Sequence, residues 1–256
     1  MITVRHLFKL PLRQTEGFVK SIFTLLKLAL QVPEFSRLSK RMKSSLPSIK
    51  KDFNNSSFNE STYLIIDSSR LKVYGEQEWL ETKYGKCYFR KVWRKLHIGI
   101  DESGYILASK LTNHKTDDRS VFADIVASAE TAVVINEVLA DRGYDSHDIY
   151  NQCRFKNIKV LIPPPSNAVI DQKRGCAYVR NETIEYINEK GIHAWYNKNN
   201  FGRRNRVENT FYQIKTIFGR KLKFRNWDNQ MHESKLICNL LNKITDLGMP
   251  KTQLVV

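Results

Sequence analysis

The stretch FGRRNRVENTFYQIKTIF, residues 201–218, decides the fold of this chain. At about 100° per residue, its apolar residues recur at helical spacing and form one narrow stripe: Val207, Phe211, Ile214 and Phe218. This stripe predicts an amphipathic helix with that side buried in a core. An adjoining stripe of the same helix carries Phe201, Arg204, Glu208 and Lys215.

Glu208 is a single carboxylate among cations. The segment from Arg203 to Arg225 contains eight basic residues, and Glu208 is its only acid. A carboxylate in such surroundings is typical of a site for a metal ion and a phosphate. A surface helix with one Arg204–Glu208 pair, worth about 0.2–0.5 kcal/mol, explains the same residues. The stretch by itself leaves both interpretations open.

The whole chain is strongly basic, with 42 Lys and Arg against 26 Asp and Glu and a net charge of +16. Nucleic acid is the expected partner, because a polyanion relieves the repulsion among so many positive charges. A membrane surface is the weaker alternative, since the cations are spread through the chain. The longest apolar stretch, Ile22–Val32, is too short to span a bilayer. The 4 cysteines complete no zinc-binding pattern and favour reduced thiols in a cytoplasmic protein.

Residues 1–47 are predicted to be helical. Apolar residues at helical spacing indicate one helix over Glu16–Val32, and a second, basic helix is expected over Glu34–Met42. Its exposed cations are the DNA-binding candidates of this region: Arg37, Lys40 and Arg41. The pattern has the outline of a helix-turn-helix, but taken alone it favours a small helical bundle with a solvated basic face. The polar residues 48–61 are predicted to be a linker.

Residues 62–247 alternate between strand and helix patterns. Strands are predicted at 63–66, 91–100, 105–111, 133–140 and 160–162, and helices at 116–130, 146–155 and 229–247. Thr116 is expected to cap the first of these helices, and residues 166–200 are expected to be a polar insertion. This order predicts an α/β domain with a mixed sheet and helices on both of its faces.

Three carboxylates are the catalytic candidates. Asp67 and Asp141 follow predicted central strands, where open α/β sheets place their sites, and Glu208 lies on a helix that must pack against that sheet. Converging carboxylates in a basic chain suit Mg²⁺. Two such ions about 3.5–4 Å apart would serve an in-line displacement at a phosphodiester.

Structural roles compete with this interpretation. An Asp at the end of a strand often caps the turn that follows, which explains Asp67 or Asp141 taken alone. Asp145 is the rival of Asp141 within the sequence ADRGYD. It is expected to cap the helix predicted from Ser146, which is a structural role.

In these segments the chain resembles the DDE transposases of bacterial insertion sequences, in the branch marked by a Tyr-Arg-Glu-Lys signature. That signature reads Tyr, two residues, Arg, three residues, Glu, six residues and Lys. Arg204, Glu208 and Lys215 match it at this spacing, and Phe201 stands where the Tyr belongs. Other similar segments are IDSSRLKVYGEQEW, KVWRKLHIGID, ADRGYD, VLIPPP and LNKITDLGMP. The resemblance extends over nearly the whole chain from about residue 6.

The resemblance implies a ribonuclease H-like catalytic domain that binds Mg²⁺, or Mn²⁺ in its place, through Asp67, Asp141 and Glu208. It implies cleavage at insertion-sequence ends and strand transfer into target DNA, by a protein that is a homodimer on double-stranded DNA. Arg204 and Lys215 would hold phosphates near the cleaved end, with Phe201 assisting. The protein would be bacterial, cytoplasmic and associated with DNA.

Two departures from the family pattern accompany this resemblance. Phe201 lacks the hydroxyl of the signature Tyr, and family members usually continue further upstream, so the chain is expected to be N-terminally shortened. Two alternatives therefore stay beside the transposase: a DNA-binding remnant that no longer cuts, and a ribonuclease H-like nuclease without strand transfer. The complete set of three carboxylates favours an enzyme.

Overall fold

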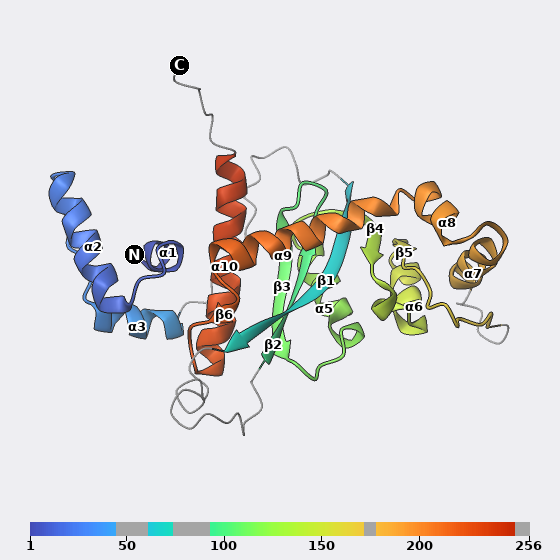
Figure 1. Ribbon diagram of the computed structural model, residues 1–256, viewed down its shortest axis with the longest axis horizontal. Coiled ribbons are helices and arrows are strands. Elements are labelled where there is room, and N and C mark those ends of the chain that lie inside the picture. The colour runs from blue at the N-terminus through green and yellow to red at the C-terminus, as the bar shows by residue number, and fades with distance from the viewer. Residues whose placement is uncertain (45–60, 74–92, 172–177, 249–256) are drawn as a thin grey trace, which may run out of the picture. The chain divides into compact units, whose positions relative to one another are not determined.

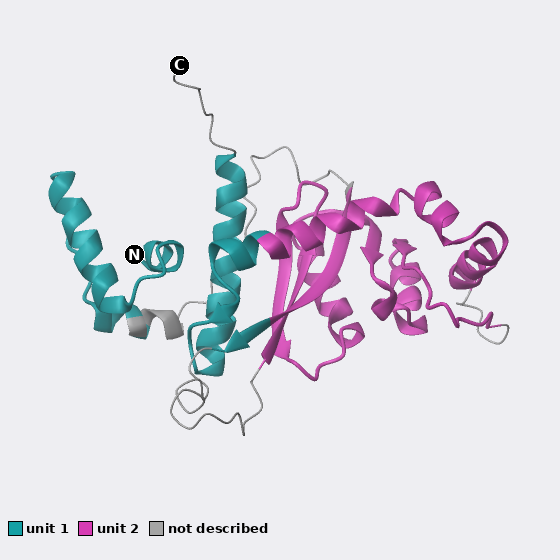
Figure 2. Ribbon diagram, viewed as in Figure 1, with its two compact units in different colours: residues 1–48, 71–92, 213–256 teal, residues 49–70, 93–212 magenta. Residues whose placement is uncertain are grey.

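The computed structural model describes residues 1–44, 61–73, 93–171 and 178–248. The chain divides into two compact units (Figure 2). Unit 1 comprises residues 1–48, 71–92 and 213–256, and unit 2 comprises residues 49–70 and 93–212. Apart from Ser61, the linker predicted over residues 48–61 lies outside the described residues.

A mixed sheet is the centre of the fold (Figure 1). Its strands are β1 (Ser61–Val73), β2 (Trp93–Ile100), β3 (Ile106–Asn113), β4 (Val134–Ala140), β5 (Lys159–Leu161) and β6 (Lys221–Leu222). Five of them follow the order β3-β2-β1-β4-β5, and β6 pairs with the end of β1. β2 and β3 form an antiparallel hairpin, whereas β1, β4 and β5 run parallel to one another. The prediction of a mixed α/β sheet is confirmed.

Strand alternation gives the sheet two buried faces in unit 2. Leu64 and Ile66 of β1 belong to a large apolar cluster with the helix α5 (Phe122–Glu130) and the helix α6 (His147–Phe155). Ile65 is equally buried, but as the residue between them it points to the opposite face. Asp67 points to that same opposite face, because it lies two residues further along the strand.

The helix predicted over residues 116–130 begins later than expected. A 3₁₀ turn, η1 (Arg119–Val121), leads into α5, and the prediction that Thr116 caps this helix is wrong. The Asp117 carboxylate accepts the backbone N–H of Arg119 at 3.2 Å, and the Asp117 carbonyl accepts the Ser120 hydroxyl. The first of these bonds satisfies a backbone N–H that a helix start leaves without a partner.

The polar insertion at residues 166–200 contains two helices that sequence patterns did not indicate. They are α7 (Tyr178–Lys190) and α8 (Ile192–Lys198), and they contact each other. Gly191 joins them with a φ of 83°, a conformation that favours glycine. Polar residues dominate the stretch, and Ile184 and Trp195 supply its buried side chains.

Unit 1 contains the N-terminal helices α1 (Ile2–Leu7), α2 (Leu12–Leu25) and α3 (Phe35–Ser44), and the long helix α10 (Trp227–Leu247). The prediction of a helix over Glu16–Val32 is wrong at both ends: α2 begins after Pro11 and ends before Lys27, whose φ is 53°. α3 contacts both α2 and α10, and Glu16 of α2 accepts the N–H of Phe35 at 2.8 Å. None of the helices in the described part of the chain combines the length and apolar character that crossing a membrane requires.

The helix predicted from residues 201–218 is present as a 3₁₀ turn, η3 (Phe201–Arg204), followed by α9 (Asn205–Ile217). All members of its predicted apolar stripe are buried: Val207, Phe211, Ile214 and Phe218. In unit 2, η3 contacts β4, and Arg206 of α9 donates to the carbonyl of Glu102 in the β2–β3 turn. The start of this helix is therefore held across the sheet from β4 to the hairpin.

Candidate active site

The parallel register of β1 and β4 brings two of the predicted carboxylates together. Ile66 pairs with Ala140, so Asp67 and Asp141 are the next residues along two hydrogen-bonded neighbouring strands. Asp141 follows the end of β4, as predicted. Asp67 does not end its strand, because β1 continues to Val73 and pairs there with β6. The prediction of a strand-end Asp is correct for Asp141 and wrong for Asp67.

The Asp141 carboxylate is fixed by the turn that follows it. It accepts the N–H of Gly143 at 2.9 Å and thereby caps the short 3₁₀ helix η2 (Arg142–Tyr144). A Cβ atom added at Gly143 would lie 3.0 Å from the same Asp141 oxygen. Glycine at position 143 therefore gives the Asp141 carboxylate its room.

Arg204 connects the other two carboxylates. One of its terminal nitrogens donates to Glu208 Oε1 at 2.8 Å, and the other lies 3.3 Å from Asp67 Oδ2. The Arg204 side chain is 16% exposed, whereas that of Glu208 is 58% exposed. The predicted Arg204–Glu208 pair exists, and in addition it reaches Asp67 on the sheet.

Burial raises the pKa of Asp67 from 3.8 to about 6. The N–H of Ser68 and the charge of Arg204 oppose this rise, while the charges of Asp141 and Glu208 add to it. All three predicted carboxylates therefore contribute to one local field. The ionised Asp67 is costly in the protein without a further cation, because its desolvation outweighs the help from Arg204.

We expect this cost to appear in the pH dependence of stability. When the folded state raises the pKa of a carboxyl group, the protein loses stability as pH rises. For Asp67 this loss extends from the pKa of the unfolded state, near 3.8, through the folded-state pKa of about 6. Asp67→Asn removes this loss, so its free energy of unfolding relative to the parent should grow by about 2–3 kcal/mol between pH 4 and pH 8, at ~1.36 kcal/mol per unit. Urea unfolding in a chelator measures it, and a difference that is independent of pH would contradict the raised pKa.

The three carboxylates suit a divalent cation in their chemistry, but they are not yet arranged around one. Carboxylate oxygens are among the donors that Mg²⁺ prefers. Within residues 1–44, 61–73, 93–171 and 178–248, no group of three acidic, His or Cys side chains is gathered closely enough to hold a metal ion. The guanidinium of Arg204 lies between Asp67 and Glu208 and contacts both.

Arg203 anchors η3 to the sheet, and sequence reasoning missed it. Its guanidinium pairs with Glu137 of β4 and lies 4.4 Å from the ring centroid of Tyr63 in β1. These contacts fix the residue next to Arg204, and so the direction from which Arg204 approaches Asp67. Glu137 lies in β4, the strand that Asp141 follows, but nothing in the local sequence couples it to Arg203.

Phe201 is buried in an aromatic cluster. Its ring stacks on Tyr196 at 5.1 Å between centroids and lies 5.2 Å from Trp195, and only 7% of the residue is exposed. A side chain in these surroundings packs η3 against α8. The prediction that Phe201 contacts DNA stays untested, and its burial favours a packing role.

Asp145 lies close to Asp141 in sequence, but its partner is in the insertion. Both carboxylate oxygens of Asp145 accept from Arg180 of α7, at 2.9–3.1 Å, and their side chains are 4% and 11% exposed. The prediction that Asp145 caps the following helix is wrong, because Ser146 is the residue at that N-cap. A buried carboxylate needs a partner of opposite charge, and Arg180 provides it. No spacing rule indicates a partner so far along the chain.

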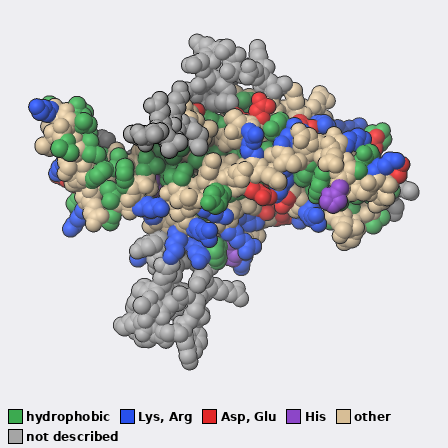
Figure 3. Space-filling model, turned by 45° about the horizontal axis from the view of Figure 1, so that its top comes forward, with side chains coloured by type: hydrophobic (Ala, Val, Ile, Leu, Met, Phe, Trp, Pro, Cys, Tyr) green, Lys and Arg blue, Asp and Glu red, His purple; other side chains and the backbone are tan. Residues whose placement is uncertain are grey.

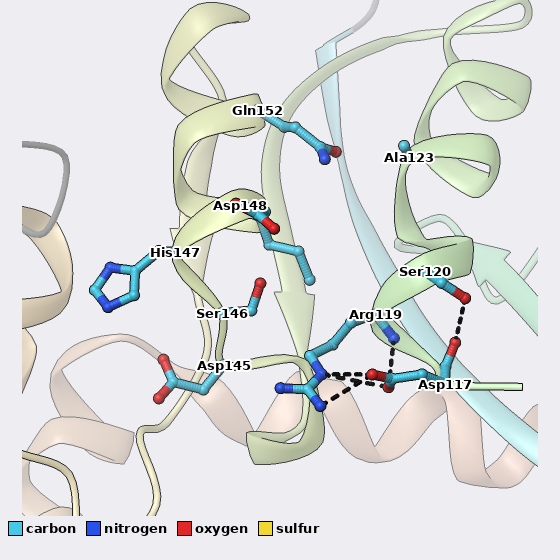
Figure 4. Close-up of a pocket in the computed structure, with 10 residues that line it drawn as sticks. Asp117, Arg119, Ser120, Ala123, Asp145, Ser146, His147, Asp148 and Gln152 are labelled. Carbon is cyan, nitrogen blue, oxygen red and sulfur yellow. Dashed lines mark hydrogen bonds and ion pairs between the residues drawn. The ribbon is translucent and has the colours of Figure 1, made fainter.

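A pocket beside Asp145 offers a second group of acids, with a volume of about 550 Å³ (Figure 4). On one side of it Asp117 pairs with Arg119, and on the other Asp145 lies beside Ser146 at the start of α6. Asp117 and Asp145 are both committed to arginine partners. The third acid of its lining is Asp148.

The predicted DNA-binding cations lie on several elements. Arg37 and Lys40 are exposed on α3, Lys215 is half-buried on α9, and the Arg41 side chain lies outside what the structure describes. Lys and Arg side chains are also spread over the face shown in Figure 3, and are not confined to one helix. Arg37, Lys40, Arg41 and Lys215 stay predictions as DNA contacts.

Comparison with protein families gives the class of this protein. Residues 59–242 match a family described as "Transposase DDE domain", and residues 1–76 match a second family of the same description. The first match extends over more than half of the chain. The chain belongs to the DDE transposase family, and its mixed sheet with flanking helices is the mixed α/β arrangement predicted from the sequence.

Distant likenesses to solved structures accompany this family match. The catalytic core domain of BIV integrase is 10% identical, with a TM-score of 0.26, and the match covers 60% of this chain and 82% of that one. For piggyBac transposase in a synaptic complex with hairpin DNA, the identity is 11% and the TM-score 0.35, and the match covers 74% of this chain and 49% of that one. For a pre-cleavage Mos1 transpososome, the identity is 10% and the TM-score 0.29, and the match covers 91% of this chain and 75% of that one. Likenesses at these scores carry no inference about the site.

Proposed function

We propose that this DDE transposase cuts double-stranded DNA at the ends of an insertion sequence and joins those ends to target DNA in a metal-dependent reaction. The observation that carries the proposal is the β1–β4 register, which makes Asp67 and Asp141 neighbours, together with Arg204, which bridges Asp67 to Glu208. Mg²⁺, or Mn²⁺ in its place, would be held by these three carboxylates. Two such ions supply Lewis-acid assistance to an in-line displacement at phosphorus.

The chain's own residues prepare this site in three ways. The turn at Gly143 orients Asp141, and Arg203 holds η3 against β4. Burial disfavours the charged form of Asp67, so a nearby cation would stabilise it. For all three carboxylates to hold an ion, Arg204 would release at least one of them. Its guanidinium is then available for a DNA phosphate, for which a bidentate donor is well suited.

Exchange of Arg204 between carboxylates and phosphate has a measurable signature. Arg204→Ala should raise the affinity for Mn²⁺ by about tenfold, because a positive charge within a few ångströms of the ligands is removed. The same change should lower the slope of log K for duplex DNA against log salt by about one. Mn²⁺ titration calorimetry and DNA binding at several salt concentrations measure the two effects.

Arg203→Ala is the matched control for this exchange, since it removes a neighbouring cation that pairs with Glu137 instead. It should leave the Mn²⁺ affinity close to that of the parent. If Arg204→Ala bound Mn²⁺ no better than this control, Arg204 would not compete with the metal ion.

The proposed partner and setting follow from charge and from the family. The net charge of +16 suits a polyanion, and DNA is the polyanion on which a transposase acts. We propose a homodimer on DNA, Lys215 as a further phosphate contact, and a bacterial, cytoplasmic, DNA-associated setting. The helices α2 and α3 are the candidate end-binding region.

The test of the function is a reaction with duplexes that carry the element's own ends, in the presence of Mn²⁺. Nicked and joined products should both appear. Nicks without joined products would favour a nuclease that lacks strand transfer. Retained DNA binding without either product would favour the non-cutting remnant. The observation on the side of this alternative is Phe201, which is buried and stands where the signature has a Tyr.

A further inference from the structure

A basic cavity lies in unit 1. Its volume is about 590 Å³, and it is lined by Arg5 and residues 9–11 and, after α9, by residues 218–221 and Lys223. Five of its lining residues are cations: Arg5, Lys9, Arg220, Lys221 and Lys223. The remaining lining residues are apolar or glycine, and the described lining contains no acid.

The wall formed by residues 221–225 is held in place by α10. Glu233, which is 1% exposed, accepts the N–H of Lys223 with both carboxylate oxygens, at 2.9 and 2.8 Å. The Gln230 side-chain amide donates to the carbonyls of Phe224 and Arg225, at 3.0 Å each. Buried polar groups that are satisfied in this way rigidify the backbone they bind.

The opposite wall, from α1, is tied to the same place. The Arg5 guanidinium lies 4.6 Å from the ring centroid of Phe224, and His6 lies 3.7 Å from Glu233. Lys9 follows in the turn after α1, where its φ is 54° and its side chain is exposed. Both walls are thus fixed before any ligand arrives.

The Lys223 amine is buried and has no hydrogen-bond partner among the described residues. Burial lowers the pKa of Lys223, and the charges of Arg5 and Lys9 lower it further, while Glu233 opposes them. Arg220 and Lys221 are exposed beside it. An anion in the cavity would relieve this repulsion and give the Lys223 amine a partner.

We propose that this cavity binds the sugar–phosphate backbone of a DNA strand. The cations would hold successive phosphates, and Leu10, Pro11 and Phe218 offer an apolar surface to the sugar between them. A single inorganic phosphate would leave most of a cavity of about 590 Å³ unfilled. This inference rests on the proposed function, because it takes DNA as the partner.

The test uses the full chain and a paired substitution, Lys9→Gln with Arg220→Gln. Both side chains are exposed, and the pair should lower the slope of log K for duplex DNA against log salt by about two, equally for any sequence. The matched control is Lys115→Gln with Lys243→Gln, which removes the same charge from exposed positions outside the cavity. The control should change the slope by much less than one.

A second readout is acetylation of individual lysines, scored by mass spectrometry. Duplex DNA should protect Lys9 and Lys221 but not Lys243. If the parent binds DNA and the paired variant has the same slope as the control, the cavity is not a DNA site, while the proposed function stands. Protection of Lys9 by inorganic pyrophosphate but not by duplex DNA would also overturn the proposal, in favour of a site for a free anion. If the parent shows no salt-dependent binding to DNA, both the proposed function and this inference fail.

Discussion

Asp67→Asn, Asp141→Asn and Glu208→Gln should each abolish DNA cleavage. We expect a loss of at least about a thousandfold, because members of one interdependent catalytic set cannot replace one another. Binding to duplex DNA should change little, since cations outside the carboxylate site supply most of the salt-dependent affinity. Rates of nicking under single-turnover conditions, with binding measured in parallel, test this.

Asp148→Asn is the control for these substitutions. Asp148 is exposed near the start of α6 and is not one of the three proposed ligands. Its substitution by Asn removes the same negative charge. Its cleavage rate should stay within a few fold of the parent. Cleavage by Asp67→Asn at a rate close to that of Asp148→Asn would remove Asp67 from the site.

Asp145→Asn should destabilise the fold without affecting the chemistry. The Asp145–Arg180 pair is almost fully buried, and its loss leaves Arg180 without its carboxylate. Breaking a buried pair from one side typically costs about 3–5 kcal/mol. We therefore expect a loss of this size in the free energy of unfolding, measured with urea, and a Mn²⁺ affinity equal to that of the parent.

Asp117→Asn gives the matched comparison, because its pair with Arg119 is about half exposed on both sides. Such surface pairs contribute about 0–1 kcal/mol. A double-mutant cycle of Asp145→Asn with Arg180→Gln should show a large coupling energy. Equal stability losses for Asp145→Asn and Asp117→Asn would contradict the structural role of Asp145, and a lost Mn²⁺ affinity would return it to the list of ligands.

Sequence patterns predicted the elements whose burial follows a simple period. The apolar stripe on α9 and the central strands were correct, because burial on one face imposes a period of 3.6 or 2. Asp141 was placed correctly because residues 138–140, the buried end of β4, stop immediately before it. The bounds of α2 were wrong because Pro11 and the positive φ of Lys27, not the apolar spacing, set its ends.

Long-range pairs could not be predicted. Asp145 and Arg180, Glu137 and Arg203, and Asp67 and Arg204 are brought together by the path of the chain through the sheet and the insertion. No spacing rule couples residues so far apart. The two insertion helices were not predicted, because polar residues dominate them and few of their side chains are buried.

The central claim is that Asp67, Asp141 and Glu208 form one metal-binding set, and Mn²⁺ binding tests it most directly. Titration calorimetry on the parent chain should detect binding, and each single substitution, Asp67→Asn, Asp141→Asn or Glu208→Gln, should weaken it by at least about tenfold, or 1.4 kcal/mol. Mn²⁺ affinities in all three variants equal to that of the parent would contradict the claim.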